Sequence, residues 1–384
     1  MNKIIIFNSI ISTFYSINNV AITPLLSLFA LTYLDATKEE LGYIMSAFFI
    51  ASVASKLIIG FLIKQKHLFT LQTFSLIIMV LSPVFYVFSG NVLAFALVRI
   101  IHGFGFAVMF LSCLTIATIL IGEKNNFSIS ILMTFTAIGM TLAPLLSTIF
   151  TFYFDIPTTF LLVSGITCLS LPLSIYLTSK KNLLFDKATE KLSLKEITDS
   201  FFKEKWFTSS FLAYFAYALI YGTITTYVPP YARQSFGFAD YQITAMFFGL
   251  FIFTIFTRAL LIKRNEKTFL KHILLSSLIF TILLLILLGI IKDPTLFAST
   301  FVLIGIGHGF IYPITAILVS NGSPPEHRLE ANTLFLISFD LGNVIGPMVA
   351  SLMVSFMPLN YVLIGSAVLP ALIWFLVVKN THSI

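Results

Sequence analysis

Twelve long apolar runs follow one another along this chain of 384 residues. A helix crosses the hydrocarbon core of a membrane with about 20 consecutive, mostly apolar residues. The runs lie at residues 4–33, 41–63, 68–88, 92–120, 127–152, 157–178, 206–230, 241–262, 269–291, 295–319, 332–356 and 361–378. Because they take up most of the chain, we expect an all-helical integral membrane protein with twelve spans and no soluble domain.

The composition excludes several other classes of protein. Charged residues make up only 10% of the chain, whereas a soluble protein of average composition has roughly 25%. A soluble enzyme, a nucleic-acid-binding domain or a disordered chain would need a larger polar surface. Cys113 and Cys168 lie in apolar runs, and their spacing indicates neither a disulfide framework nor a zinc site. We therefore expect no enzyme, no metal site and no cofactor.

The lysines and arginines between the runs are distributed unequally. If the N-terminus is cytoplasmic, the outer loops hold only Lys38, Arg233 and Lys292, and the inner loops hold all the others that lie outside the runs. Cytoplasmic loops of membrane proteins carry such an excess of positive charge. We therefore place both termini in the cytoplasm, and we expect a multi-pass protein of the plasma (inner) membrane. The net charge of +7 then reflects topology rather than binding to nucleic acid.

One inner loop, residues 179–205, is long, polar and charged. It separates the first six runs from the last six. We expect an N-terminal six-helix bundle at residues 1–178, a cytoplasmic linker at 179–205 and a C-terminal six-helix bundle at 206–384.

Short motifs recur in the same order in the two halves. The triplet His-Gly-Phe recurs after 206 residues, a Gly-x-x-x-[Ala/Gly]-Pro motif after 203, and a basic residue in the second and eighth runs after 202. The matched positions are 102–104 with 308–310, 139–144 with 342–347, and Lys56 with Arg258. Three matches in one order indicate a duplicated six-helix unit, as many transporters have. In this comparison His308 takes the place of His102.

These motifs carry a resemblance to a known family. The pattern R-x-x-[QH]-G-x-G that starts at Arg99, the Gly-Pro motif of the fifth run and the turn at 323–328 resemble the major facilitator superfamily over the whole chain. The Gly-Pro motif is similar to that of its proton-driven exporters, including short drug antiporters and metallophore exporters. The resemblance implies two six-helix bundles around a central cavity, alternating access and a monomer.

The chain departs from that family in the loop after the second run, where Lys64 stands in place of an aspartate that helps to latch the inner gate. We hypothesise that Lys64 or Lys66 pairs with Glu326 or Glu330 across this gate. Arg328 belongs to the turn that resembles the family's inner gate.

Ionisable residues within a span are costly and are therefore functional candidates. Asp340 is the one clear carboxylate inside a run. It either carries the coupling proton, since an apolar medium favours the neutral acid, or is the fixed partner of a cation. Lys56 and Arg258 lie near the inner ends of their runs, where they either act at the gate or extend to the lipid headgroups.

The other candidates also have structural alternatives. Arg99 either contacts substrate or anchors its helix by bonding Asn18 or Asn19. His102 and His308 either relay protons, since imidazole titrates near neutral pH, or bond a nearby carbonyl.

Several aromatic and small residues complete the candidate list. Tyr214, Tyr217 and Tyr221 recur on one helix face, where they either contact substrate or pack between helices. Small residues and prolines let helices approach closely and bend, so we expect conformational roles for five of them. These five are Gly103, Gly139, Pro144, Gly342 and Pro347.

The charges inside the runs favour a particular class of substrate. Lys56, Arg99 and Arg258 outnumber Asp340. We therefore expect a proton-coupled exporter of a small anionic or zwitterionic molecule, such as a metabolite or a metallophore. A multidrug/proton antiporter and a proton-coupled importer remain alternatives. The expected partners are this small molecule, the proton and the lipid bilayer, with no nucleic acid.

Overall fold

The computed structural model describes residues 2–62, 67–119, 127–180, 200–261, 267–324 and 328–381. Helices make up nearly all of these residues, and the described part of the chain contains no strand. Among the described residues, twelve helical segments are long and apolar enough to cross a membrane. The predicted all-helical fold with twelve spans is thus confirmed.

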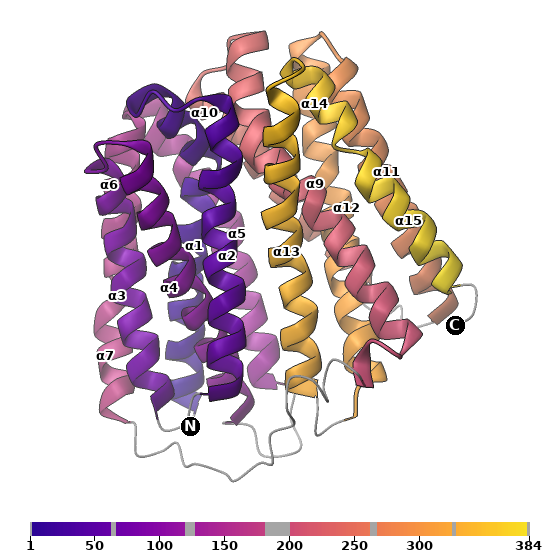
Figure 1. Cartoon of the computed structure of the whole chain (residues 1–384). Coiled ribbons are helices and arrows are strands. Elements are labelled where there is room, and N and C mark those ends of the chain that lie inside the picture. Colours follow the sequence, from indigo (N-terminus) through magenta and orange to yellow (C-terminus); the bar gives the residue numbers. More distant parts are fainter. Residues whose placement is uncertain are drawn as a thin grey trace. The chain divides into compact units, whose positions relative to one another are not determined.

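The helices follow one another along the chain (Figure 1). Their bounds are α1 Asn2–Tyr33, α2 Lys38–Leu62, α3 Leu68–Val87, α4 Val92–Ile119, α5 Phe127–Tyr153, α6 Ile156–Cys168, α7 Leu171–Ser179, α9 Lys205–Phe236, α10 Asp240–Leu261, α11 Lys267–Ile290, α12 Pro294–Gly322, α13 Arg328–Val354, α14 Leu359–Gly365 and α15 Val368–Thr381.

The sixth and twelfth spans, predicted at 157–178 and 361–378, each consist of two helices in succession. α6 stops at Cys168 before α7 begins, and α14 stops at Gly365 before α15 begins. A proline follows each break, Pro172 in α7 and Pro370 in α15. Proline lacks the N–H that would bond the carbonyl four residues earlier, so the helix turns before it resumes.

The chain divides into two compact units. Unit 1 comprises residues 1–36, 47–190 and 239–248, and unit 2 comprises residues 37–46, 191–238 and 249–384. The first turns of α2 therefore belong to unit 2, and the first turns of α10 belong to unit 1. In unit 1, α1 packs against α5, and α3 packs against α4 and α6. In unit 2, α9 packs against α13, α12 and α15.

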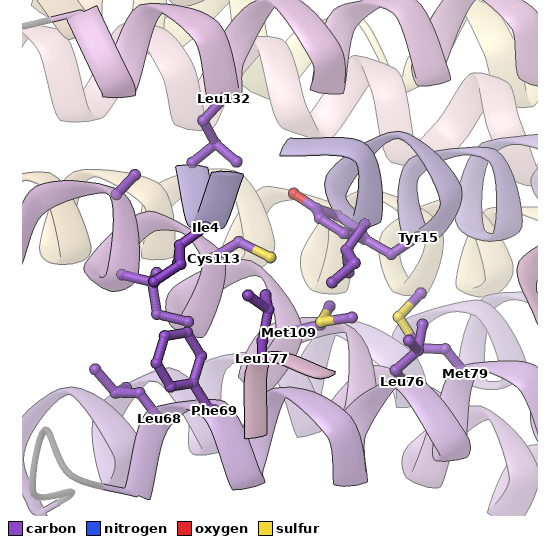
Figure 2. Close-up of a cluster of buried hydrophobic side chains, with 13 residues drawn as sticks. Ile4, Tyr15, Leu68, Phe69, Leu76, Met79, Met109, Cys113, Leu132 and Leu177 are labelled. Atoms are coloured by element: carbon purple, nitrogen blue, oxygen red, sulfur yellow. The ribbon is translucent and has the colours of Figure 1, made fainter. Parts of the chain in front are cut away.

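A buried apolar cluster joins the helices of unit 1 on the side of α3 (Figure 2). The cluster includes Phe69 of α3, Met109 and Cys113 of α4, and Leu177 of α7. Cys113 is completely buried there, and its Sγ accepts a hydrogen bond from Nε2 of Gln72 at 3.1 Å.

Glycines at matching positions allow the same helix contact in each unit. A Cβ added to Gly103 of α4 would meet the carbonyl of Phe48 on α2. In unit 2, a Cβ added to Gly305 of α12 would meet the carbonyl of Leu250 on α10. Gly103 and Gly305, like Phe48 and Leu250, are 202 residues apart. Only a residue without a side chain permits such an approach of two backbones.

Two basic side chains show the same spacing of 202 residues. In unit 1, Lys56 Nζ lies 5.8 Å from the ring centroid of Phe110. In unit 2, Arg258 Cζ lies 5.7 Å from the ring centroid of Tyr312. The two units therefore repeat the contact between the second and fourth helices of each half.

A third pair of contacts corrects our alignment of the histidines. Tyr15 and Phe106 are in contact in unit 1, with ring centroids 6.0 Å apart. Tyr217 and His308 make the corresponding contact in unit 2, with centroids 5.4 Å apart. His308 therefore occupies the place of Phe106, and our prediction that it takes the place of His102 is wrong. The triplet match is four residues out of register, which is about one helical turn and keeps nearly the same helix face.

Candidate substrate and coupling site

In unit 1, His102 belongs to a closed hydrogen-bond network. Its Nδ1 lies 3.0 Å from the hydroxyl of Tyr86, and its Nε2 lies 3.1 Å from Oδ1 of Asn18. The side-chain amide of Asn18 donates to the carbonyl of Met79 at 3.1 Å and to Oγ1 of Thr167 at 3.0 Å. The network thus connects α4 to α1, α3 and α6.

The directions of these bonds fix the form of the His102 ring. A carbonyl only accepts, so the nitrogen of Asn18 must face Met79, and its oxygen must face His102. Nε2 of His102 therefore donates, and Nδ1 accepts from the hydroxyl of Tyr86. Both ring nitrogens have partners and the ring is completely buried. A neutral imidazole with its proton on Nε2 satisfies both bonds.

Arg99, one turn from His102, is also enclosed by its own unit. The side chain is 2% exposed, and its guanidinium lies 4.5 Å from the ring centroid of Phe48. It also interacts with the hydroxyl of Tyr86. Asn19 is only partly buried, whereas Asn18 is completely buried. His102 of α4 bonds Asn18.

In unit 2, His308 has a different environment. The hydroxyl of Tyr217 lies 2.6 Å from Nδ1 of His308. The other ring nitrogen, Nε2, is buried and has no hydrogen-bond partner among the described residues. The ring stacks on Tyr221 at 5.6 Å and meets the edge of Phe251 at 5.7 Å. One ring nitrogen of His308 thus lacks a hydrogen-bond partner among the described residues, whereas both ring nitrogens of His102 have one.

Six rings around His308 form one connected group, which we call the unit 2 aromatic cluster. Its members are Tyr214, Tyr217, Tyr221, Tyr312, Phe335 and Phe339. Tyr214 stacks on Phe335 and on Phe339, with 4.9 Å between centroids in each pair. The rings come from α9, α12 and α13, and the three predicted tyrosines of α9 all belong to the cluster.

Two opposite charges lie at this cluster. The guanidinium of Arg258 approaches Tyr312, and its Nε is buried without a hydrogen-bond partner in the described part of the chain. Asp340, next to Phe339 on α13, is 1% exposed. Arg258 and Asp340 both interact electrostatically with Tyr214. The structure therefore brings three of the predicted residues, His308, Arg258 and Asp340, to one aromatic cluster.

The remaining candidates fall in several places. Lys56 is 4% exposed, beside Phe110. Lys64, Lys66 and Glu326 lie outside the described residues, and Arg328 begins α13 without a described side chain. Glu330 is partly buried, with its Oε2 unpartnered among the described residues.

The predicted conformational residues lie at helix contacts or within helices. Gly139 faces α1 at Thr13, and Gly342 faces α9 at Ala218. Gly103 faces α2, as described above. Pro144 lies within α5 and Pro347 within α13.

Sequence reasoning missed several residues of these two networks. Among them are Tyr86, Thr167, Tyr312, Phe335 and Phe339. A spacing of 202 residues from Phe110 would have identified Tyr312, because the basic pair Lys56 and Arg258 already showed that spacing. The described residues contain no group of three or more His, Cys, Asp or Glu that could hold a metal ion.

Comparisons with known proteins agree on the fold. The sequence profile of the Major Facilitator Superfamily matches residues 9–347 and, in a second match, residues 269–383. A bacterial homolog of the human lysosomal transporter Spinster, solved inward-facing and unoccupied, has a TM-score of 0.77 at 15% identity, covering 98% of this chain and 96% of that chain. The nucleoside transporter NupG has a TM-score of 0.73 at 15% identity, covering 99% of both chains. No curated protein sequence matches significantly.

Proposed function

The chain belongs to the major facilitator superfamily, and from this premise we propose that it is a proton-coupled exporter of a small zwitterionic or anionic molecule. The family and the structural neighbours point to a transporter rather than an enzyme. Transport would proceed by alternating access, with the substrate bound at the unit 2 aromatic cluster. The protein would act as a monomer in the plasma membrane, with both termini in the cytoplasm.

The observation that carries this proposal is the pair of unpartnered nitrogens at the cluster, Arg258 Nε and His308 Nε2. A buried polar group without a partner costs about 1–3 kcal/mol, and a bound ligand can supply the missing hydrogen bond. An unpaired guanidinium donor suits a carboxylate or a phosphate. We therefore place the anionic group of the substrate at Arg258.

The duplicated architecture supports a site in unit 2 rather than in unit 1. At the positions of His308 and Tyr312, unit 1 has Phe106 and Phe110. The histidine of unit 1 is instead occupied by helix-to-helix bonds. At these two positions the scaffold thus has polar side chains in unit 2 and apolar side chains in unit 1, which supports a site in unit 2.

Asp340 gives a physical reason to prefer a zwitterion over a simple anion. An anion bound beside a carboxylate favours its protonation, so substrate and proton would bind together and move in the same direction. A cationic group bound there displaces the proton, so the two bind alternately, as antiport requires. A zwitterion can place its anionic group at Arg258 and its cationic group at Asp340. This arrangement fits proton-driven export.

One observation favours a second candidate, a multidrug/proton antiporter. A buried carboxylate among aromatic rings also suits a hydrophobic cation, because ring faces attract positive charge. In that case Arg258 would repel the substrate, and its removal would increase affinity. A proton-coupled importer would use the same residues with co-binding of substrate and proton.

The experiment that tests the proposal is transport in proteoliposomes with an imposed proton gradient and a panel of zwitterionic, anionic and cationic metabolites. We expect a zwitterion to move against the proton flux. Asp340→Asn should abolish the dependence on the gradient but retain substrate exchange, and Asp340→Glu should restore coupling. A transport rate that does not depend on the proton gradient would overturn export by antiport. Movement of substrate only in the same direction as the protons would also overturn it.

A further inference from the structure

Three buried polar atoms of unit 2 lie at the aromatic cluster without a hydrogen-bond partner among the described residues. They are Arg258 Nε, His308 Nε2 and Asn343 Oδ1. Asn343 is completely buried, and its amide nitrogen donates to the carbonyl of Phe339 at 2.9 Å. Two unpaired nitrogens and one unpaired oxygen can together serve a ligand that has both acceptors and donors.

The rings between these atoms differ in their exposure. Tyr214, Tyr217 and Phe335 are buried, whereas Tyr221, Tyr312 and Phe339 are only partly buried. The three partly buried rings are therefore the ones that a ligand can reach. Two of these rings contact the residues with unpartnered nitrogens. Arg258 lies at Tyr312, and His308 stacks on Tyr221.

Four pairs of rings within the cluster are stacked, and three pairs are tilted by 33°, 40° and 41°. Tyr214 is inclined by 21° to Phe335 and by 22° to Phe339, and Tyr214 and Tyr217 are inclined by only 3°. Parallel rings present flat faces, and a flat ligand can add a further layer to such a stack.

We propose, on the basis of the proposed function, that the zwitterion bound at this cluster has a planar aromatic ring, as aromatic amino acids and their derivatives do. Its carboxylate pairs with Arg258, its ammonium group lies towards Asp340, and its ring packs on Tyr221 and Phe339. Nε2 of His308 supplies a further hydrogen bond to a polar atom of the ligand.

Four probes separate the parts of this proposal. L-phenylalanine has the ring and both charges, and 3-cyclohexyl-L-alanine replaces only the ring. The compound 3-phenylpropanoate lacks the ammonium group, and 2-phenylethylamine lacks the carboxylate. Binding to the full-length protein in lipid nanodiscs would be measured by calorimetry at one pH and one salt concentration.

We expect L-phenylalanine to bind most tightly. 3-Cyclohexyl-L-alanine should bind roughly threefold to tenfold more weakly, because it loses ring stacking. Each single-charge analogue should bind about tenfold or more weakly, because it loses a charge-assisted contact. Tyr221→Leu should abolish the preference for the aromatic probe, and Tyr221→Phe should retain it.

Several results would overturn the proposal. Equal affinity for L-phenylalanine and 3-cyclohexyl-L-alanine would exclude recognition of the ring. Tightest binding of 2-phenylethylamine would show a site for organic cations, and tightest binding of 3-phenylpropanoate would show a site for simple acids. Failure of all four probes to bind to the folded protein would exclude an aromatic zwitterion.

The outcome is separate from that of the transport experiment, because binding needs no proton gradient. If the probes bind in the expected order and no gradient drives transport, proton-coupled export fails and the ligand class stands. If a gradient drives the export of aliphatic zwitterions alone, the function stands and the aromatic class fails.

Discussion

The hydroxyl of Tyr217 lies 2.6 Å from Nδ1 of His308, at the position where unit 1 has the contact between Tyr15 and Phe106. A packing contact of one half has thus become a hydrogen bond in the other half. The second nitrogen of the His308 ring remains unpaired among the described residues. The predictions below follow from this difference between the two units.

Replacing His308 with Phe gives unit 2 the residue that unit 1 has at this position. The single variant leaves the buried hydroxyl of Tyr217 without its acceptor, which costs about 1–3 kcal/mol. The double variant Tyr217→Phe/His308→Phe removes both polar partners and should recover most of that loss. Thermal denaturation in detergent would compare the three proteins. A double variant less stable than His308→Phe would contradict the simple pairing.

Replacing His102 with Phe should destabilise the protein more than replacing His308. The change removes the partner of Asn18 Oδ1 and one partner of the Tyr86 hydroxyl, and we expect a loss of about 2–4 kcal/mol from two unsatisfied groups. Thermal denaturation measures this loss. A His102→Phe protein with the stability of the wild type would show that the network does not support the fold.

Alanine at Gly103 or Gly305 should disturb the same helix contact in both units. The added methyl group would meet the carbonyl of Phe48 or of Leu250, and such overpacking costs about 1–3 kcal/mol. Gly165 of α6 is the matched control, because nothing lies within 4 Å of a Cβ added there. Gly165→Ala should be neutral or stabilising by up to about 1 kcal/mol. Equal effects at all three glycines, in thermal denaturation, would contradict the close approach.

Arg258→Gln should weaken the binding of a transported zwitterion by about tenfold or more, because it removes the charge that pairs with the carboxylate. The matched control is Lys56→Gln at the equivalent position of unit 1, which should change affinity by less than about threefold. Calorimetric titration of both variants gives the comparison. Similar losses at Lys56 and Arg258 would show that both units contribute to the site.

The spans could be predicted from the sequence because each one needs only a sufficient length of apolar residues. The breaks before Pro172 and Pro370 were missed, since a proline near a helix end is compatible with an unbroken span. Other prolines, such as Pro144, lie inside helices that continue. The sequence alone does not separate these two outcomes.

The register of the repeat shows where short motifs mislead. A triplet that matches one turn out of register keeps its residues on nearly the same face, so the sequence offered two alignments of α4 with α12. Only contacts with a neighbouring helix, such as that of Gly305 with Leu250, distinguish them. The partners of His102 were likewise unpredictable, because Tyr86 lies on a different helix.

The most direct measurement of the central claim compares His308→Phe with His102→Phe in proteoliposomes that contain equal amounts of folded protein. The substrate is the panel compound that the wild-type protein transports under an imposed proton gradient. We predict that His308→Phe lowers the transport rate at least about tenfold. The rate of His102→Phe, normalised to the amount of folded protein, should equal that of the wild type. Retained transport in His308→Phe together with loss in folded His102→Phe would contradict a functional site in unit 2.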